Sequence, residues 1–211
     1  LGVTGTACAN EIARDADVVV VIGTRLSDFT TASKTQFQNE RVRFISINVN
    51  AMDAHKHGAL PIVADAQLAI DALTSALAGK RFDTAHVETA RDAWLAQRAG
   101  LTSRDRGTTA VTSALPTVSS SITQADVIAT INELAPKNAT VVHAAGGIPG
   151  DIHKLWMSRE HDDYHSEYGY SCMGYEIAGG LGVKLARPER EVFALLGDGS
   201  WLMLANEIVT A

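Results

Sequence analysis

The sequence predicts an α/β fold built from two doubly wound parallel-sheet units. Helical and strand-like patterns alternate along most of the chain, and this alternation favours parallel sheets. The apolar, β-branched run DVVVVIG (17–23) is typical of a strand buried on both faces of such a sheet. With 46% apolar and 20% charged residues, the composition fits a globular protein with a hydrophobic core.

The first predicted unit covers residues 1–79, and its elements follow from periodicity and end signals. In chain order we expect a helix over 6–16 with Thr6 as a possible N-cap, strands over 17–23, 43–50 and 60–65, and a helix over 66–79 that ends at Gly79. Residues 80–121 differ in character. The stretch 83–100 has the pattern of a surface helix, and the small, polar stretch 102–121 is typical of a linker.

The second predicted unit covers residues 122–211, where the alternating pattern returns. Its expected elements are a helix over 125–135, a strand over 139–145, a loop rich in His, Asp and Tyr over about 158–170, a helix over 174–186, a strand over 191–196 and a last helix reaching Ala211. We expect no internal repeat.

Charge and cysteine usage exclude several classes of partner. The formal charge is −6, from 24 acidic and 18 basic residues, and no basic run argues for nucleic acid or an anionic membrane. The two cysteines, Cys8 and Cys172, match no disulfide or metal spacing, which favours a reducing, cytoplasmic location. Because the chain begins at Leu1 without Met and stops at Ala211 inside a helical pattern, we expect a piece of a longer protein.

The motif GDGS (197–200) directly follows the predicted strand EVFALL. Ligands of open parallel sheets bind where strands end and helices begin. Gly197 and Gly199 allow close backbone approach, and the amide of Ser200 can face phosphate oxygens. Asp198 alone repels a phosphate, but a Mg²⁺ ion would make the carboxylate and the phosphate ligands of one cation. The alternative is a strand-to-helix turn in which Asp198 is only the N-cap.

Other phosphate and catalytic motifs fit this stretch less well. It lacks the GK[ST] of a P-loop, the third glycine of a dinucleotide fingerprint and the second glycine of a nucleophile elbow. AAGGIPGD (144–151) is a second glycine-containing loop at a predicted strand end.

Two further features of the second unit leave alternatives open. HDDYHSEY (161–168) is either a polar loop lining a pocket or a metal site that uses His161, His165 and Glu167. Met173 is either a core residue or an adaptable apolar support for the aromatic ring of a cofactor. Cys172 is interpreted as a small apolar filler.

The stretch LGVKLARPEREVFALLGDGS (181–200) resembles the signature of thiamine-diphosphate enzymes. GVTGTACANEIARDADVVVVIGTRLSDF and YGYSCMGYEIAGGLGV resemble the middle domain and the cofactor-domain loop of the acetolactate-synthase-like branch. Within that branch, SDFTTASKTQFQN, DAHKHGALPIVADA, GDIHKLW and YHSEYGYSCMGYEIAGG are most similar to hydrolases of myo-inositol catabolism, which act on a polyhydroxylated cyclic 1,2-dione. The resemblance implies a Rossmann-like middle domain followed by a pyrophosphate-binding domain.

The resemblance also implies roles for individual residues. Asp198 matches the Mg²⁺ ligand, Met173 matches the apolar residue that holds thiamine diphosphate in its bent shape, and the diphosphate-binding backbone is expected at Gly146, Gly147, Gly197, Gly199 and Ser200. No catalytic side chain is expected in residues 1–211. The activating glutamate is expected in a preceding domain and the second metal ligand beyond Ala211, so residues 1–211 alone are expected to be inactive.

The implied enzyme is a homodimer or homotetramer that hydrolyses a carbon–carbon bond between two carbonyl carbons. A carboligase or 2-oxoacid decarboxylase of the same branch would share every cofactor residue. A nucleotide-binding regulatory α/β module is the non-enzyme alternative.

Overall fold

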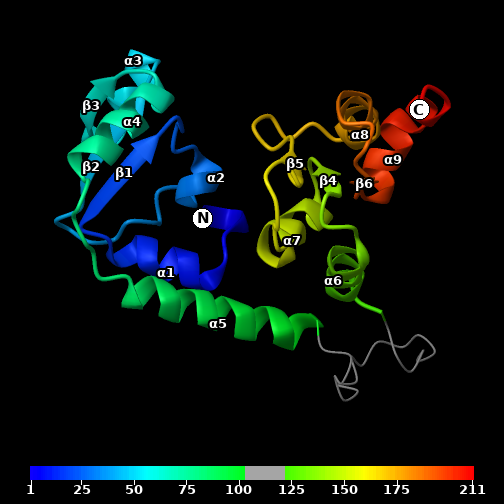
Figure 1. The fold of residues 1–211 in the computed structure, drawn as a ribbon, viewed down its shortest axis with the longest axis horizontal. Coiled ribbons are helices and arrows are strands. Elements are labelled where there is room, and N and C mark those ends of the chain that lie inside the picture. The colour runs from blue at the N-terminus through cyan, green and yellow to red at the C-terminus, as the bar shows by residue number, and fades with distance from the viewer. Residues whose placement is uncertain (103–121) are drawn as a thin grey trace. The chain divides into compact units, whose positions relative to one another are not determined.

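A computed structural model describes residues 1–102 and 122–211 of the chain (Figure 1). These residues form two compact units, Leu1–Ala96 and Gln97–Ala211. The polar stretch predicted as a linker falls mostly at 103–121, outside the described residues. No helix in the described ranges is long and apolar enough to cross a bilayer.

The first unit has a parallel sheet with strand order β1-β2-β3. Its helices and strands are α1 (Ala7–Asp15), β1 (Val18–Ile22), α2 (Asp28–Thr31), β2 (Arg43–Asn48), α3 (Ala51–Ala54), β3 (Leu60–Val63), α4 (Ala66–Ala76) and the beginning of α5 (Ala85–Thr102). Short 3-10 turns lie at Gly2–Thr4 and Lys56–Gly58. The predicted cap of α1 is confirmed, because the Thr6 hydroxyl accepts a hydrogen bond from the amide of Ala9.

The second unit has a parallel sheet with strand order β5-β4-β6. Its elements after α5 are α6 (Gln124–Leu134), β4 (Thr140–His143), α7 (Gly147–Leu155), β5 (Tyr164–Ser166), α8 (Tyr175–Ala186), β6 (Val192–Ala194), α9 (Asp198–Leu204) and a 3-10 turn at Ala205–Val209. A capping box starts α6: Thr123 accepts from the amide of Asp126, and the Asp126 carboxylate accepts from the amide of Thr123.

Helices cover both faces of the second sheet. Val141 packs into a core with residues of α6 and α7, namely Ile128, Ile152, Leu155 and Trp156. Val142 and Ala194 pair in the sheet and lie on the opposite face, because successive strand residues alternate. A Cβ built on Gly180 of α8 would lie 3.6 Å from the Ala194 side chain, so α8 packs closely on this second face. Figure 1 shows α7 and α8 on opposite sides of the strands.

One prediction about the first sheet, the burial of its first strand, is wrong. The run 17–23 was expected to be buried on both faces, but Val20 is 51% exposed whereas Val21 is buried. Val18 and Val20 lie on one face of β1, because successive strand residues alternate, and this face is exposed. Three parallel strands in sequential order with right-handed crossovers would have their connections on one face, which fits this one-sided burial.

Several local predictions are also wrong or incomplete. The segment 158–170, expected to be a loop, contains β5, which pairs with β4. The glycine loop at 144–151 already contains the start of α7, with Pro149 tolerated in the first helical turn. The last helix ends at Leu204 and continues as a 3-10 turn. The short helices α2 and α3 were not predicted.

Candidate functional site

The strand order of the second sheet places a topological switch point at its carboxyl edge, which is the position where open parallel sheets bind ligands and is called the crevice below. The chain leaves β4 for β5 on one side and then crosses to β6 on the other side of β4. At such a reversal the connections from two neighbouring strands diverge, which leaves room for a ligand outside the strand ends. The two strands end side by side, because the amide of Leu195 donates to the carbonyl oxygen of Val142 at 2.9 Å.

Both predicted glycine loops lie at this crevice. Gly146 follows β4 as the N-cap of α7, and Gly197 follows β6 as the N-cap of α9; neither helix start has a side-chain cap. A Cβ built on Gly146, Gly147 or Gly197 would meet no other atom within 4 Å. Packing within the chain therefore does not require these glycines, although the φ of 110° at Gly146 does favour glycine. Open backbone with uncapped amides fits an anionic group.

Asp198 lies in the first turn of α9 and is exposed to solvent. The alternative that it serves only as the N-cap is wrong, since that position belongs to Gly197. Asp198 Oδ1 accepts from the amide of Gly199 at 2.9 Å, which orients the carboxylate at the start of the helix. Ser200, next in the motif, is 1% exposed.

Met173 lies beside this motif rather than in the core. Met173 is 40% exposed. Its Cε would lie 3.0 Å from a Cβ built on Gly199. The structure thus brings together Met173 and Gly199, two residues distant in sequence for which a cofactor role was predicted. Cys172 was interpreted as a buried filler, but it is exposed, so that interpretation is wrong.

The donors around Asp198 limit how a metal could bind. No group of three or more His, Cys, Asp or Glu side chains in the described ranges is arranged to hold a metal ion. Mg²⁺ is commonly held by one or two carboxylates together with phosphate oxygens and water, so a lone exposed aspartate fits a metal that arrives with a phosphate ligand. His161 and His165 do not converge: His161 is exposed beside Asp162, and His165 Nε2 lies 2.6 Å from the Tyr175 hydroxyl.

A cluster of aromatic and imidazole rings around the buried His143 lies at the end of β4. His143, the last residue of β4, contacts the rings of His153 and Tyr164 edge-on, with centroids 5.0 and 4.9 Å away. The Tyr164 hydroxyl lies 2.8 Å from His153 Nδ1. Burial lowers the pKa of His143 to about 4, so this side chain is neutral at physiological pH. No sequence motif indicated this cluster.

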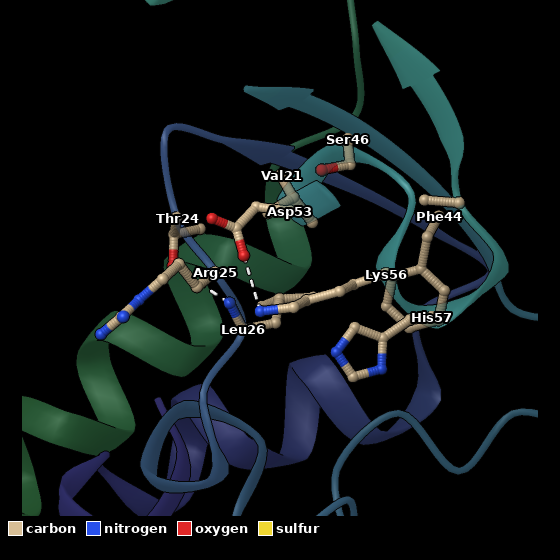
Figure 2. A pocket seen from close by; sticks show the side chains of 10 residues that line it. Val21, Thr24, Arg25, Leu26, Phe44, Ser46, Asp53, Lys56 and His57 are labelled. Atoms are coloured by element: carbon tan, nitrogen blue, oxygen red, sulfur yellow. Dashed lines mark hydrogen bonds and ion pairs between the residues drawn. The ribbon is translucent and has the colours of Figure 1, made fainter. Parts of the chain in front are cut away.

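The first unit has a small hollow lined by residues of β1, β2 and the segments that follow them (Figure 2). Its empty space is about 200 Å³, including the part open to solvent. Figure 2 shows Lys56 extending across the hollow to Asp53, with their charged atoms 2.6 Å apart. The volume of the hollow is below the roughly 300–1,000 Å³ of usual ligand pockets. We place the candidate site in the second unit, because both glycine loops and Asp198 lie where its strand order reverses.

Comparison with known proteins agrees with this placement. Residues 1–73 match the family "Thiamine pyrophosphate enzyme, central domain", and residues 144–211 match "Thiamine pyrophosphate enzyme, C-terminal TPP binding domain". The second match contains the glycine loops, Met173 and Asp198. The chain belongs to the thiamine pyrophosphate enzymes.

Similar members of this enzyme family occur in several bacteria. The chain is 44% identical over 226 residues to a 3D-(3,5/4)-trihydroxycyclohexane-1,2-dione hydrolase of Bacillus anthracis, 44% identical over 229 residues to that of Bacillus cereus (strain AH820), and 43% identical over 226 residues to that of Bacillus thuringiensis (strain Al Hakam). Each match covers 100% of this chain and 35% of the relative. The chain thus spans about a third of the length of these thiamine pyrophosphate enzymes.

Proposed function

We propose that this chain is part of a thiamine-diphosphate- and Mg²⁺-dependent hydrolase that cleaves a polyhydroxylated cyclic 1,2-dione. The observation that supports the substrate class is the 44% identity, over the whole chain, to enzymes named for this dione. The ring would open by net addition of water: one carbonyl carbon becomes a carboxylic acid and the other an aldehyde, giving an open-chain deoxyuronic acid. The proposed setting is myo-inositol catabolism in the cytoplasm.

The residues at the crevice fit the diphosphate end of the cofactor. The backbone amides at Gly146, Gly147 and Ser200 belong to helix starts without side-chain caps, which suit phosphate oxygens. The Gly199 amide donates to Asp198 Oδ1 and would join them if that carboxylate turned to a metal ion. Asp198 is the proposed protein ligand of Mg²⁺. Its carboxylate would supply a hard oxygen ligand to a Mg²⁺ ion that also binds the diphosphate oxygens.

Met173 is proposed to support the ring system of the cofactor. When bound, thiamine diphosphate supplies a nucleophilic carbon and an electron sink for carbon–carbon cleavage. The part of this chain is to bind and orient: the helix starts fix one end of the cofactor, and the partly exposed apolar side chain of Met173 contacts the other. Proton transfer is assigned to no residue of this chain.

The decisive experiment is an assay of the full-length enzyme with thiamine diphosphate and Mg²⁺, using the cyclic dione or pyruvate as substrate. Ring opening of the dione, with one carboxylate formed per turnover and no acetolactate from pyruvate, is the expected result. Acetolactate or acetaldehyde as the main product would favour a carboligase or a decarboxylase. No binding of thiamine diphosphate would favour a regulatory module. Sedimentation of the same sample tests the proposed homodimer or homotetramer.

A further inference from the structure

The loop that carries Met173 has a backbone shape that an isolated chain would rarely adopt. This segment, residues 167–174 and hereafter the Met173 loop, connects β5 to α8. Ser171 has a φ of 59° and Gly174 a φ of 92°, both in the left-handed region. That region is unfavourable for a residue with a side chain such as Ser171. The shape therefore depends on partners elsewhere in the fold.

Glu167 supplies one set of partners from the end of β5. Its Oε2 accepts from the amide of Cys172 at 2.7 Å, and its Oε1 accepts from the amide of Tyr170 at 3.1 Å. These bonds, chiefly the one from Cys172, lower the pKa of the Glu167 carboxyl, so it is ionised at neutral pH. Glu167 is itself anchored, because its own amide donates to the carbonyl oxygen of His143 on β4 at 3.0 Å.

Glu176 supplies the second partner, from inside the fold. It lies in the first turn of α8 and is fully buried. Its Oε2 accepts from the amide of Gly174 at 2.9 Å, at the left-handed turn that ends the Met173 loop. On its other side this turn packs on α9, since a Cβ built on Gly174 would lie 3.0 Å from Leu204. A buried carboxylate that accepts a backbone amide is costly to replace by an apolar group.

We propose that Glu167 and Glu176 are positioning residues that fix the Met173 loop from its two ends and so hold the Met173 side chain against Gly199. The inference rests on the proposed function, because it assumes that Met173 contacts the cofactor. Neither carboxylate is assigned a contact with substrate or cofactor. Both carboxylates accept from backbone amides of the Met173 loop, at Tyr170, Cys172 and Gly174. Their effect on turnover is exerted through the position of the Met173 side chain.

The test uses the full-length enzyme with Glu167→Ala, Glu167→Gln, Glu176→Gln and, as a matched control, Glu133→Gln. Glu133 lies exposed on α6 and makes no hydrogen bond within the described part of the chain through its side chain. Turnover is measured at saturating cofactor, along with thiamine diphosphate affinity and amide hydrogen exchange over residues 167–174.

Glu167→Ala should lower kcat by about fivefold with little change in cofactor affinity, because misplacing a cofactor contact affects turnover more than binding of the diphosphate. Exchange over residues 167–174 should accelerate. Glu176→Gln keeps the one acceptor oxygen that Glu176 uses and should retain most of kcat. Glu167→Gln keeps only one of two acceptor oxygens and turns an NH2 group toward the other amide, so its kcat should fall between those of the wild type and Glu167→Ala. Glu133→Gln should match the wild type in every measurement.

A double-mutant cycle separates this role from general support of the fold. In a Met173→Ala background, Glu167→Ala should lower kcat no further, because the side chain that it positions is gone. Additive losses in the two variants, or normal kcat in Glu167→Ala, would overturn the inference while leaving the proposed function intact. Absence of thiamine diphosphate binding by the wild type would instead overturn the proposed function, and this inference with it.

Discussion

The two sheets of this chain share a parallel architecture but differ in strand order. In the second unit β4 is central, all of its residues are buried, and the chain crosses from one side of it to the other. In the first unit the order follows the sequence, and Val18 and Val20 of β1 are exposed on one face. Both sheets also end a strand near a left-handed glycine: Gly23 after β1 and Gly146 after β4.

Strand order, more than a glycine at a strand end, is the basis on which we place the proposed ligand site. Of the two sheets described, only the second has a reversal of strand order, with connections that diverge from neighbouring strands. At the corresponding side of the first unit, the described residues form a hollow that the Asp53–Lys56 ion pair crosses. We therefore expect changes in the second unit to affect the cofactor and equivalent changes in the first unit to leave it bound.

The largest expected effect comes from replacing the proposed metal ligand. Asp198→Ala in the full-length enzyme should weaken thiamine diphosphate binding by about 100-fold or more when Mg²⁺ is limiting, because metal charge stabilisation is worth several kcal/mol. The matched change in the first unit is Asp53→Asn, which disturbs the ion pair with Lys56. The thiamine diphosphate affinity of the Asp53→Asn variant should stay close to that of the wild type. Titration calorimetry at several Mg²⁺ concentrations measures both, and equal losses would contradict the comparison.

The next effect is acid sensitivity of the second unit. The pKa of His143 is about 4 in the folded chain, because burial opposes protonation, against 6.5 for a solvent-exposed histidine. As pH falls below 6.5 the unfolded chain binds the proton first, so stability is complete above about 6.5 and is lost towards pH 4. The gap corresponds to about 3 kcal/mol.

Hydrogen exchange between pH 7 and 4 tests this prediction unit by unit. Protection should fall first in the second unit, and His143→Phe should flatten the dependence there. The exposed His161 provides the control, because His161→Gln should leave the profile unchanged. Earlier loss of protection in the first unit would contradict the prediction.

A smaller effect is expected when a methyl group is added at the crevice. Gly197 has an ordinary φ of −84°, and a Cβ there would meet no atom within 4 Å, so Gly197→Ala should change folding stability little. If the diphosphate approaches this backbone, the methyl group should displace a charge-assisted hydrogen bond, worth roughly 1.5–3 kcal/mol, or about 10- to 100-fold in affinity. Gly23→Ala, in the first unit, should not change affinity. Unchanged affinity in Gly197→Ala would remove Gly197 from the site.

The sequence allowed prediction of the elements that carry periodic apolar patterns and clear end signals. The strands at 43–50 and 60–65 and the helix at 174–186 are confirmed within the usual uncertainty of their ends. β5 was missed because its residues Tyr164, His165 and Ser166 are polar or aromatic, and only pairing with β4 reveals the strand. Burial of both faces of β1 could not be judged from its residues, since it depends on strand order.

For the proposed site, too, the sequence indicated only residues that stand in a local motif or in a stretch that resembles a known family. Its glycine loops and Asp198 stand in a local motif, and the resemblance to a family added Met173. Glu167 and Glu176 left no such signal, because each acts on a backbone amide in a loop whose shape depends on tertiary packing. The ring cluster around His143 likewise joins segments that are separate in sequence.

Met173→Ala should cost little stability, and it tests whether Met173 serves the crevice or the core. A buried methionine truncated to alanine typically costs about 2–5 kcal/mol. Met173 is 40% exposed and its Cε lies beside Gly199 at the start of α9, so the loss of folding stability should stay below about 1 kcal/mol. Turnover at saturating cofactor should nevertheless fall by about tenfold, because a contact that orients the cofactor is lost.

Met203 on α9, 58% exposed, serves as the control, and Met203→Ala should lower neither quantity appreciably. The measurements are the melting temperature without cofactor and kcat per folded molecule. A large fall in melting temperature with normal kcat would assign Met173 to packing and would leave the crevice defined by Asp198 and the glycine loops alone.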